Sequence, residues 1–300
     1  MVNVNIESSK EVKYMKIAVL SDLHGNHIAL KKCMVEIKKR DIRKIIFLGD
    51  YIGELAYPQK IMKLLGEIRK DYECICLRGN KEDYWIDRKK YSHSGWKEKD
   101  STTGMLYYAY KNMTEDDLTF FESLPYVQMI RFEDLPVIAA YHGSHNQQGE
   151  KLKLNTDNYR QLFDDTNASV ILCGHTHVRK EIHEKNRILL NPGSVGMPLQ
   201  SDGKTQFLIM SGENQQWKHE FIDLEYDIEA VIRELQEENL YEIAPCWTRI
   251  TEHMLRNGSV SHGTVLTKAN QLCHEETGNW GWPNLPEKYW EMAVKEYLGV

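Results

Sequence analysis

Six short polar clusters constrain this chain most, because each begins where an apolar run ends. The runs are rich in aliphatic and β-branched residues and are bounded by Gly and Asp, a pattern typical of buried strands. The clusters are Asp22-Leu23-His24, Gly49-Asp50, Gly79-Asn80, His142-Gly143, Gly174-His175-Thr176-His177 and Asn191-Pro192-Gly193-Ser194. A rigid sheet commonly presents a site through polar side chains at its strand ends. The sequence therefore predicts a sheet-based fold with one composite site.

The first part of the chain alternates strands with helices. An apolar stripe over residues 28–37 predicts an amphipathic helix after the first strand, and Pro58 begins a second helix after the next strand. Strand, helix, strand, helix, strand implies parallel strands joined by right-handed crossovers. From 81 to 123 the pattern is mainly helical, with a capping-box-like start at Thr114.

Strands return in the second part and then stop. Strands are expected at 126–132, 136–141, 169–172, 178–183, 187–190, 205–210 and 216–222, with a helix near 157–164. Helical spacing follows at 228–235, 245–256, 262–274 and 286–298. We therefore predict an N-terminal extension (1–14), an α/β domain (15–225) and a helical C-terminal extension (226–300).

Charge, hydrophobicity and cysteine content limit the binding partners and the cellular compartment that we expect for this chain. A net charge of -6 argues against a dedicated nucleic-acid surface, although metal ions could neutralise a nucleotide. No apolar stretch approaches the roughly 20 residues of a membrane span, and residues 1–14 lack the apolar core of a signal peptide. The six Cys include Cys74, Cys76 and Cys173 in expected strands. We expect a reduced, cytoplasmic protein without disulfides; its oligomeric state is open.

The clusters supply seven side chains that bind divalent metal ions: Asp22, His24, Asp50, Asn80, His142, His175 and His177. Asp22 and His24 are two residues apart at a strand end, so both can point to the same side. Carboxylate with imidazole suits Mn, Fe, Zn or Ni better than Ca or Mg. Asp50 has two oxygens that can bridge two ions, and two ions roughly 3.5–4 Å apart can clamp a phosphoryl group. These features predict a two-metal hydrolase, whereas the alternative is that the Asp and Asn residues only cap helices.

Order and residue types resemble the calcineurin-like metallophosphoesterase superfamily, with the pattern D-x-H, G-D, G-N-H-[DE], H, G-H-x-H, from residue 16 to about 222. Ser21 to Asn26 and Gly49 to Gly53 resemble its compact bacterial branch. The resemblance implies a four-layered αββα sandwich of two mixed β-sheets with the site at strand C-terminal ends. By this resemblance one metal takes Asp22, His24, Asp50 and His177, and the other takes Asp50, Asn80, His142 and His175.

The implied activity is metal-dependent hydrolysis of a phosphodiester or phosphomonoester in a small phosphorylated substrate. Hydroxide bridging the metals would attack phosphorus directly, without a covalent enzyme intermediate. A nucleotide or serine/threonine protein phosphatase is an alternative. A non-catalytic scaffold with this fold is another.

One motif departs from the family. Gly79-Asn80-Lys81-Glu82 has Lys81 where the family has the His held to protonate the leaving group. Lys81 could supply positive charge but would be a poor acid near neutral pH. His27 and His145 lie close in sequence to metal-bearing loops and could replace that acid, or could be exposed or supporting residues. Arg78 resembles the phosphate-gripping Arg of serine/threonine phosphatases, and a surface ion pair is its alternative role.

Two further features, the tryptophans of the tail and the cluster beginning at Asn191, could have either a structural or a functional role. The tail residues Trp247, Trp280, Trp282 and Trp290 predict a satellite apolar cluster, with a substrate lid or partner surface as the alternative. The cluster beginning at Asn191 is expected to form a turn that braces the loop carrying His175 and His177, called the histidine loop below.

Overall fold

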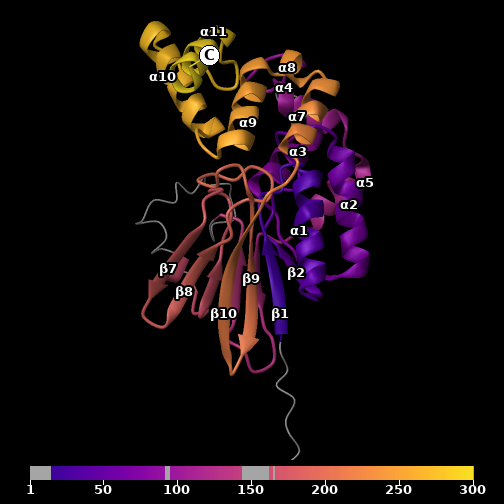
Figure 1. Cartoon of the computed structure of the whole chain (residues 1–300). Coiled ribbons are helices and arrows are strands. Elements are labelled where there is room, and N and C mark those ends of the chain that lie inside the picture. Colours follow the sequence, from indigo (N-terminus) through magenta and orange to yellow (C-terminus); the bar gives the residue numbers. More distant parts are fainter. Residues whose placement is uncertain (1–14, 92–94, 144–161, 165, 300) are drawn as a thin grey trace, which may run out of the picture.

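The computed structural model describes residues 15–91, 95–143, 162–164 and 166–299. Two five-stranded mixed sheets form an α/β sandwich. The C-terminal helices lie beyond the carboxyl ends of the parallel strands (Figure 1). The expected two-sheet fold with a helical C-terminal segment is thereby confirmed.

The first sheet has the order β10-β9-β1-β2-β3. Its strands are β1 (Met15–Leu20), β2 (Lys44–Phe47), β3 (Glu73–Cys76), β9 (Thr205–Glu213) and β10 (Gln216–Leu224). β1, β2 and β3 are parallel, with α1 (His27–Lys39) and α2 (Pro58–Asp71) between them, as the alternation predicted. β9 and β10 are antiparallel additions.

The second sheet has the order β4-β5-β6-β8-β7. Its strands are β4 (Val127–Ile130), β5 (Ile138–Tyr141), β6 (Val170–Leu172), β7 (Lys180–Glu184) and β8 (Arg187–Asn191). β5, β6 and β8 are parallel, whereas β4 and β7 are antiparallel edges. The parallel strands of both sheets therefore carry the clusters at their carboxyl ends.

Side chains alternate between the two faces of each strand, which explains the layers. In β1, Ala18 and Leu20 pack against α1 and α2, whereas Ile17 and Val19 pack against the second sheet. The outer face of the second sheet is contacted by Leu162 and Phe163. The helix expected near 157–164 falls mostly outside the described residues, and 162–164 are helical.

The described residues between 80 and 123 form three helices, α3 (Asn80–Lys90), α4 (Gly104–Lys111) and α5 (Glu115–Ser123). The C-terminal helices are α7 (Ile228–Glu237), α8 (Leu240–Ile243), α9 (Pro245–Asn257), α10 (His262–Thr277) and α11 (Glu287–Leu298). Among these C-terminal helices only α8 was not predicted from the sequence, because its four residues are too few for a periodic signal.

The C-terminal helices share an apolar core with the loops of the sandwich. That core combines their buried residues with Leu55, Ala56, Met105, Tyr108 and Met197. The C-terminal helices therefore pack against the edge of the sheets that holds the polar clusters. None of the described helices is long and apolar enough to cross a membrane. All six cysteines are free thiols.

Candidate metal centre and pocket

The seven predicted ligand side chains come together at the carboxyl ends of β1, β2, β3, β5 and β6. Asp50 lies between two histidines: its Oδ2 is 3.6 Å from His24 Nε2 and 3.5 Å from His142 Nε2. Asp22 Oδ1 is 3.3 Å from His177 Nε2. Asn80 Oδ1 completes the cluster, 2.7 Å from His175 Nδ1 and 3.1 Å from His142 Nε2.

The backbone adopts an uncommon conformation at these positions. Five of the seven residues have positive φ angles between 47° and 69°: Asp22, His24, Asp50, His175 and His177. Neighbouring glycines permit the close packing of these loops. A Cβ at Gly174 would lie 1.9 Å from Ser21 Oγ, and one at Gly79 would lie 2.2 Å from Asp50 Oδ1. Such a concentration of left-handed non-glycine residues is typical of functional sites.

In His142 and His177, a contact at Nδ1 directs Nε2 toward the centre. His142 Nδ1 lies 2.9 Å from the Leu48 carbonyl oxygen, and His177 Nδ1 lies 2.7 Å from that of Met197. A carbonyl only accepts, so both Nδ1 atoms carry a proton, and both Nε2 atoms are directed toward the cluster. This arrangement of outer hydrogen bonds is the one found around metal-binding histidines.

The buried carboxylates raise the pKa values of neighbouring histidines, because they favour positive charge nearby. Burial alone would lower the pKa of His24, but Glu54, Asp22 and Asp50 raise it to about 10. Burial likewise opposes ionisation of His142, yet Asp50 and Asp22 raise its pKa to about 9. A bound cation would satisfy these carboxylates without protonating the rings.

The donor set fits transition-metal ions. Asp22 Oδ2 accepts hydrogen bonds from Ser21 Oγ at 2.5 Å and from the His175 backbone N–H at 3.0 Å. Asp22 Oδ1 is buried and has no hydrogen-bond partner among the described residues. Two groups of ligand atoms each lie within 4.8 Å of one another: Asp22, His24 and His177, and Asp22, Asp50 and His142. A buried carboxylate oxygen that accepts no hydrogen bond and lies among imidazole nitrogens is suited to Mn, Fe, Zn or Ni.

Two glutamates that the sequence analysis did not assign hold the centre. Glu54 Oε2 lies 2.5 Å from His24 Nδ1. Glu82 accepts hydrogen bonds from the backbone N–H groups of Asp50, Tyr51 and Gly79 at 2.7–2.9 Å. Burial and the nearby Asp50 raise the pKa of Glu82 to about 7. Glu82 stands in a recognisable motif, whereas no sequence signal identified Glu54.

Lys81 extends into the pocket beside the cluster. Its ammonium pairs with Glu54 Oε1, and the side chain is 13% exposed. The rings of Tyr84 and Trp247 lie 6.0 and 5.9 Å from its Nζ. Burial would lower the pKa of Lys81, but the charge of Glu54 and the hydrogen bond to it raise the pKa above its ordinary value. Lys81 therefore brings a fixed positive charge to the place where the family has a histidine.

Arg78 does not line the pocket beside the ligand cluster. Its Nε and Nη2 bind Asp83 Oδ1 at 2.8 and 2.7 Å, and its guanidinium lies 4.7 Å from the centre of the Tyr126 ring. This geometry corresponds to the ion pair that was the alternative role, so we propose no phosphate contact for Arg78.

Of the two histidines considered as replacement acids, His27 and His145, the structure describes only His27. His27 Nε2 lies 2.9 Å from Glu234 Oε2, which ties the start of α1 to α7. His27 is buried and does not appear among the described residues of the pocket wall. His145 lies outside the described residues.

The turn at Asn191 braces the histidine loop, as expected. Asn191 Nδ2 donates to the Gly174 carbonyl oxygen at 2.7 Å and to Thr176 Oγ1 at 3.1 Å. Ser194 Oγ donates to the Asp22 carbonyl oxygen at 2.8 Å. This turn therefore links the loops after β1 and β6 without reaching into the pocket.

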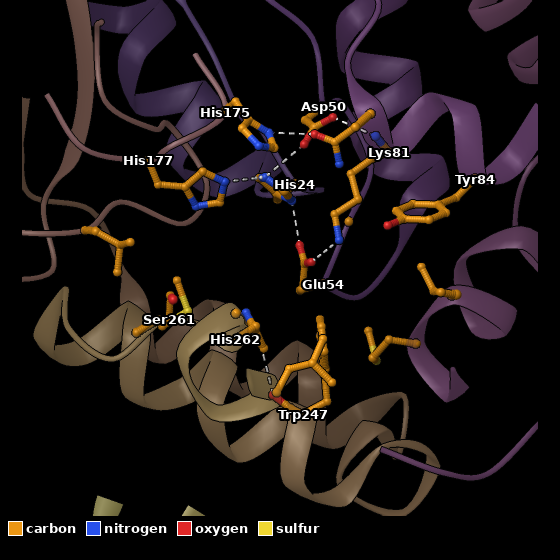
Figure 2. Close-up of a pocket in the computed structure, with 18 of the residues that line it drawn as sticks. His24, Asp50, Glu54, Lys81, Tyr84, His175, His177, Trp247, Ser261 and His262 are labelled. Carbon is orange, nitrogen blue, oxygen red and sulfur yellow. Dashed lines mark hydrogen bonds and ion pairs between the residues drawn. The ribbon is translucent and has the colours of Figure 1, made fainter. Parts of the chain in front are cut away.

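A pocket of about 310 Å³ lies in front of the ligand cluster. Figure 2 shows the cluster on one side and the C-terminal helices, with Trp247, Ser261 and His262, on the other. Trp282 also lines the pocket, whereas Trp290 is buried in the helical core and Trp280 is 66% exposed. Trp247 and Trp282 thus line the pocket, Trp290 lies in the apolar cluster, and Trp280 lies in neither.

Fold and site together define an α/β sandwich with a candidate metal centre at the carboxyl ends of its strands. The calcineurin-like phosphoesterase superfamily domain matches residues 15–215, and the chain belongs to this family. An uncharacterized protein of Methanocaldococcus jannaschii, MJ0912, is 28% identical over 244 residues, which are 75% of this chain and 94% of that protein.

Two solved structures share the fold. A metallophosphoesterase from Sphaerobacter thermophilus superposes with a TM-score of 0.64 at 22% identity, over 82% of this chain and 100% of that one. The hypothetical protein PH1004 from Pyrococcus horikoshii OT3 gives a TM-score of 0.67 at 20% identity, with the same coverage.

Proposed function

We propose that this protein is a phosphoric ester hydrolase that uses two divalent transition-metal ions and acts on a small phosphorylated substrate. One observation carries the proposal. Asp50 Oδ2 lies at nearly equal distances from His24 Nε2 and His142 Nε2, one from each predicted ligand set. A carboxylate in that position can bridge two ions and set their spacing.

When bound, the ions would supply Lewis-acid stabilisation of the phosphoryl oxygens and activate the attacking water. Asp22, His24, Asp50 and His177 would hold one ion, and Asp50, Asn80, His142 and His175 the other. In the overall reaction water adds to phosphorus, the phosphorus–oxygen bond to the alcohol breaks, and the alcohol leaves with one proton. Lys81 would face the oxygens of the phosphate or of the leaving group and offset their negative charge.

The test begins with metal-stripped full-length protein. Phosphomonoesters and phosphodiesters are assayed after adding Mn, Fe, Zn, Ni or Mg, and bound metal is measured by elemental analysis. We expect activity to return with a transition metal at a stoichiometry above one ion per chain. Protein that binds no metal after addition of Mn or Zn would refute the proposal.

A non-catalytic scaffold makes a different prediction. It would bind a protein through this fold and would leave all esters intact even with metal bound. The pocket in front of the ligand cluster favours the enzyme, because a scaffold has no need of a cavity there.

A further inference from the structure

We propose that the pocket selects phosphate esters whose alcohol portion is a compact aromatic or aliphatic group, held by Trp247 and Leu266 of the C-terminal helices. This inference rests on the proposed function, because it concerns the part of the substrate attached to the phosphate. It assigns the helical extension a role in substrate selection.

The pocket has two chemically different ends. The ligand cluster, Glu54 and Lys81 make one end polar. The other end is formed by apolar and aromatic side chains from α3, α4, α9, α10 and nearby loops: Tyr84, Met105, Leu106, Leu199, Trp247, Met254, Leu266 and Trp282. A phosphate at the polar end would place its alcohol portion against this apolar wall (Figure 2).

Thr102 and His262 in the apolar wall are already engaged with the protein, and Trp247 Nε1 is buried without a hydrogen-bond partner among the described residues, so it is not offered to a ligand. Thr102 Oγ1 accepts from Trp290 Nε1 at 2.9 Å and donates to the Leu285 carbonyl oxygen at 3.3 Å. His262 Nε2 lies 2.9 Å from Thr251 Oγ1 and 3.2 Å from the carbonyl oxygen of Trp247. Sugar hydroxyls or base edges would lose water here and find few partners, which disfavours a nucleotide.

Charge also disfavours a polyphosphate. Lys81 is the single Lys or Arg among the described residues that line the pocket, and Glu54 already pairs with it. A second phosphate group would have to compete with that carboxylate. One phosphate bound at the ligand cluster, with an uncharged group beyond it, fits this distribution better.

The Trp247 ring is fixed before any ligand binds. It stacks on His262 with ring centroids 4.2 Å apart and planes inclined by 20°. Its edge-to-face contact with the buried Trp290 has a centroid distance of 5.7 Å. A preorganised aromatic wall lowers the entropic cost of binding an apolar group.

Size limits the substrate further. The volume of about 310 Å³ is at the small end of the roughly 300–1,000 Å³ typical of small-molecule sites. A single aromatic ring system, such as phenyl or naphthyl, or a short aliphatic chain fits this space together with a phosphate. A folded phosphoprotein does not.

The experiment measures binding and not turnover. Calorimetry on the Mn-loaded full chain compares 1-naphthylphosphonate, methylphosphonate and the non-hydrolysable phosphonate analogue of adenosine monophosphate, for the parent and for Trp247→Ala. We expect naphthylphosphonate to bind most tightly in the parent and to lose about tenfold in affinity in the variant, with little change for methylphosphonate. Trp247→Phe should keep most of the affinity, and Trp280→Ala, which changes an exposed tryptophan outside the pocket wall, should keep all of it.

Leu266→Asn is the second variant, because it makes the same wall polar without removing Trp247. It should also weaken naphthylphosphonate selectively. Equal losses for naphthylphosphonate and methylphosphonate, or tighter binding of the adenosine phosphonate than of naphthylphosphonate in the parent, would overturn the inference and leave the proposed function standing. If none of the three phosphonates binds the metal-loaded chain and no ester is hydrolysed, the proposed function fails as well.

Discussion

Glu54 joins two different parts of the candidate site: one carboxylate oxygen lies 2.5 Å from His24 Nδ1, and the other pairs with the ammonium of Lys81. The first contact directs His24 Nε2 toward the other ligand atoms. The second holds Lys81 at the mouth of the cluster. A single buried carboxylate thus couples the orientation of a predicted metal ligand to the position of the pocket's cation.

We predict that Glu54→Gln weakens metal binding by about 10–100-fold, the usual effect of removing an outer partner of a metal-binding histidine. Titration of metal-stripped protein with Mn measures the affinity, and activity at saturating Mn shows how much function returns. Glu67→Gln is the matched control, since Glu67 is exposed on α2. Unchanged Mn affinity in Glu54→Gln would show that His24 needs no such support.

The bridging role of Asp50 gives a stronger prediction. Asp50→Asn should lower both the metal stoichiometry and the activity, and by more than about the 100-fold expected for an outer partner. Asp41→Asn is a close control, because Asp41 also has a positive φ but its side chain is 85% exposed. Full activity with two ions bound in Asp50→Asn would remove Asp50 from the centre.

The strands that hold the cluster were predictable because local sequence determines them. Buried runs that end in Asp, Asn or His are visible without knowing the fold, and parallel strands bring such ends to one edge. The partners of the cluster were not predictable in this way. Glu54 reaches His24 across two loops, and Trp247 stacks on His262 between two helices.

Arg78 is a second case in which the sequence could not predict the partners of a side chain. Its sequence context resembles a phosphate-binding motif, yet its guanidinium pairs with Asp83 of α3 and packs on Tyr126. Whether an arginine meets a carboxylate or faces a pocket depends on side-chain direction, which a motif does not specify. The turn at Asn191 was easier to foresee, because its side chain acts on neighbouring backbone in a way typical of Asn.

Lys81 should make the rate depend strongly on the leaving group. Its ammonium is held by Glu54, so an alkoxide would depart largely without a proton from this position. General-acid help is typically worth about 10²–10⁴ in rate, which leaves a wide range to measure. A series of aryl and alkyl phosphate esters should give a steep dependence of rate on leaving-group pKa in the parent and a flatter one in Lys81→His.

Lys81→Arg serves as the control that keeps the positive charge without adding an acid, and it should retain the steep slope. A shallow slope in the parent would show that another group donates the proton. His145→Ala would then be the next variant to measure.

The stability of the chain should depend on pH through His262, which is buried at the start of α10. Burial, with the nearby positive charge of Lys81, lowers the pKa of His262 to about 3 from 6.5. The folded state then binds fewer protons than the unfolded state between these values, so the stabilisation is complete above pH 6.5 and is lost as the pH falls toward 3. From pH 7 to pH 5 the loss is about 2 kcal/mol.

Urea unfolding of metal-free protein at several pH values measures this effect, and metal-free protein keeps metal release from contributing. His262→Gln should lose about 2 kcal/mol less than the parent between pH 7 and pH 5, because Gln has no proton to take up on unfolding. His183→Gln, at a side chain 65% exposed, should follow the parent. If parent and His262→Gln lose stability in parallel, His262 is already protonated in the folded protein, and its contacts with Thr251 and Trp247 must be those of an imidazolium.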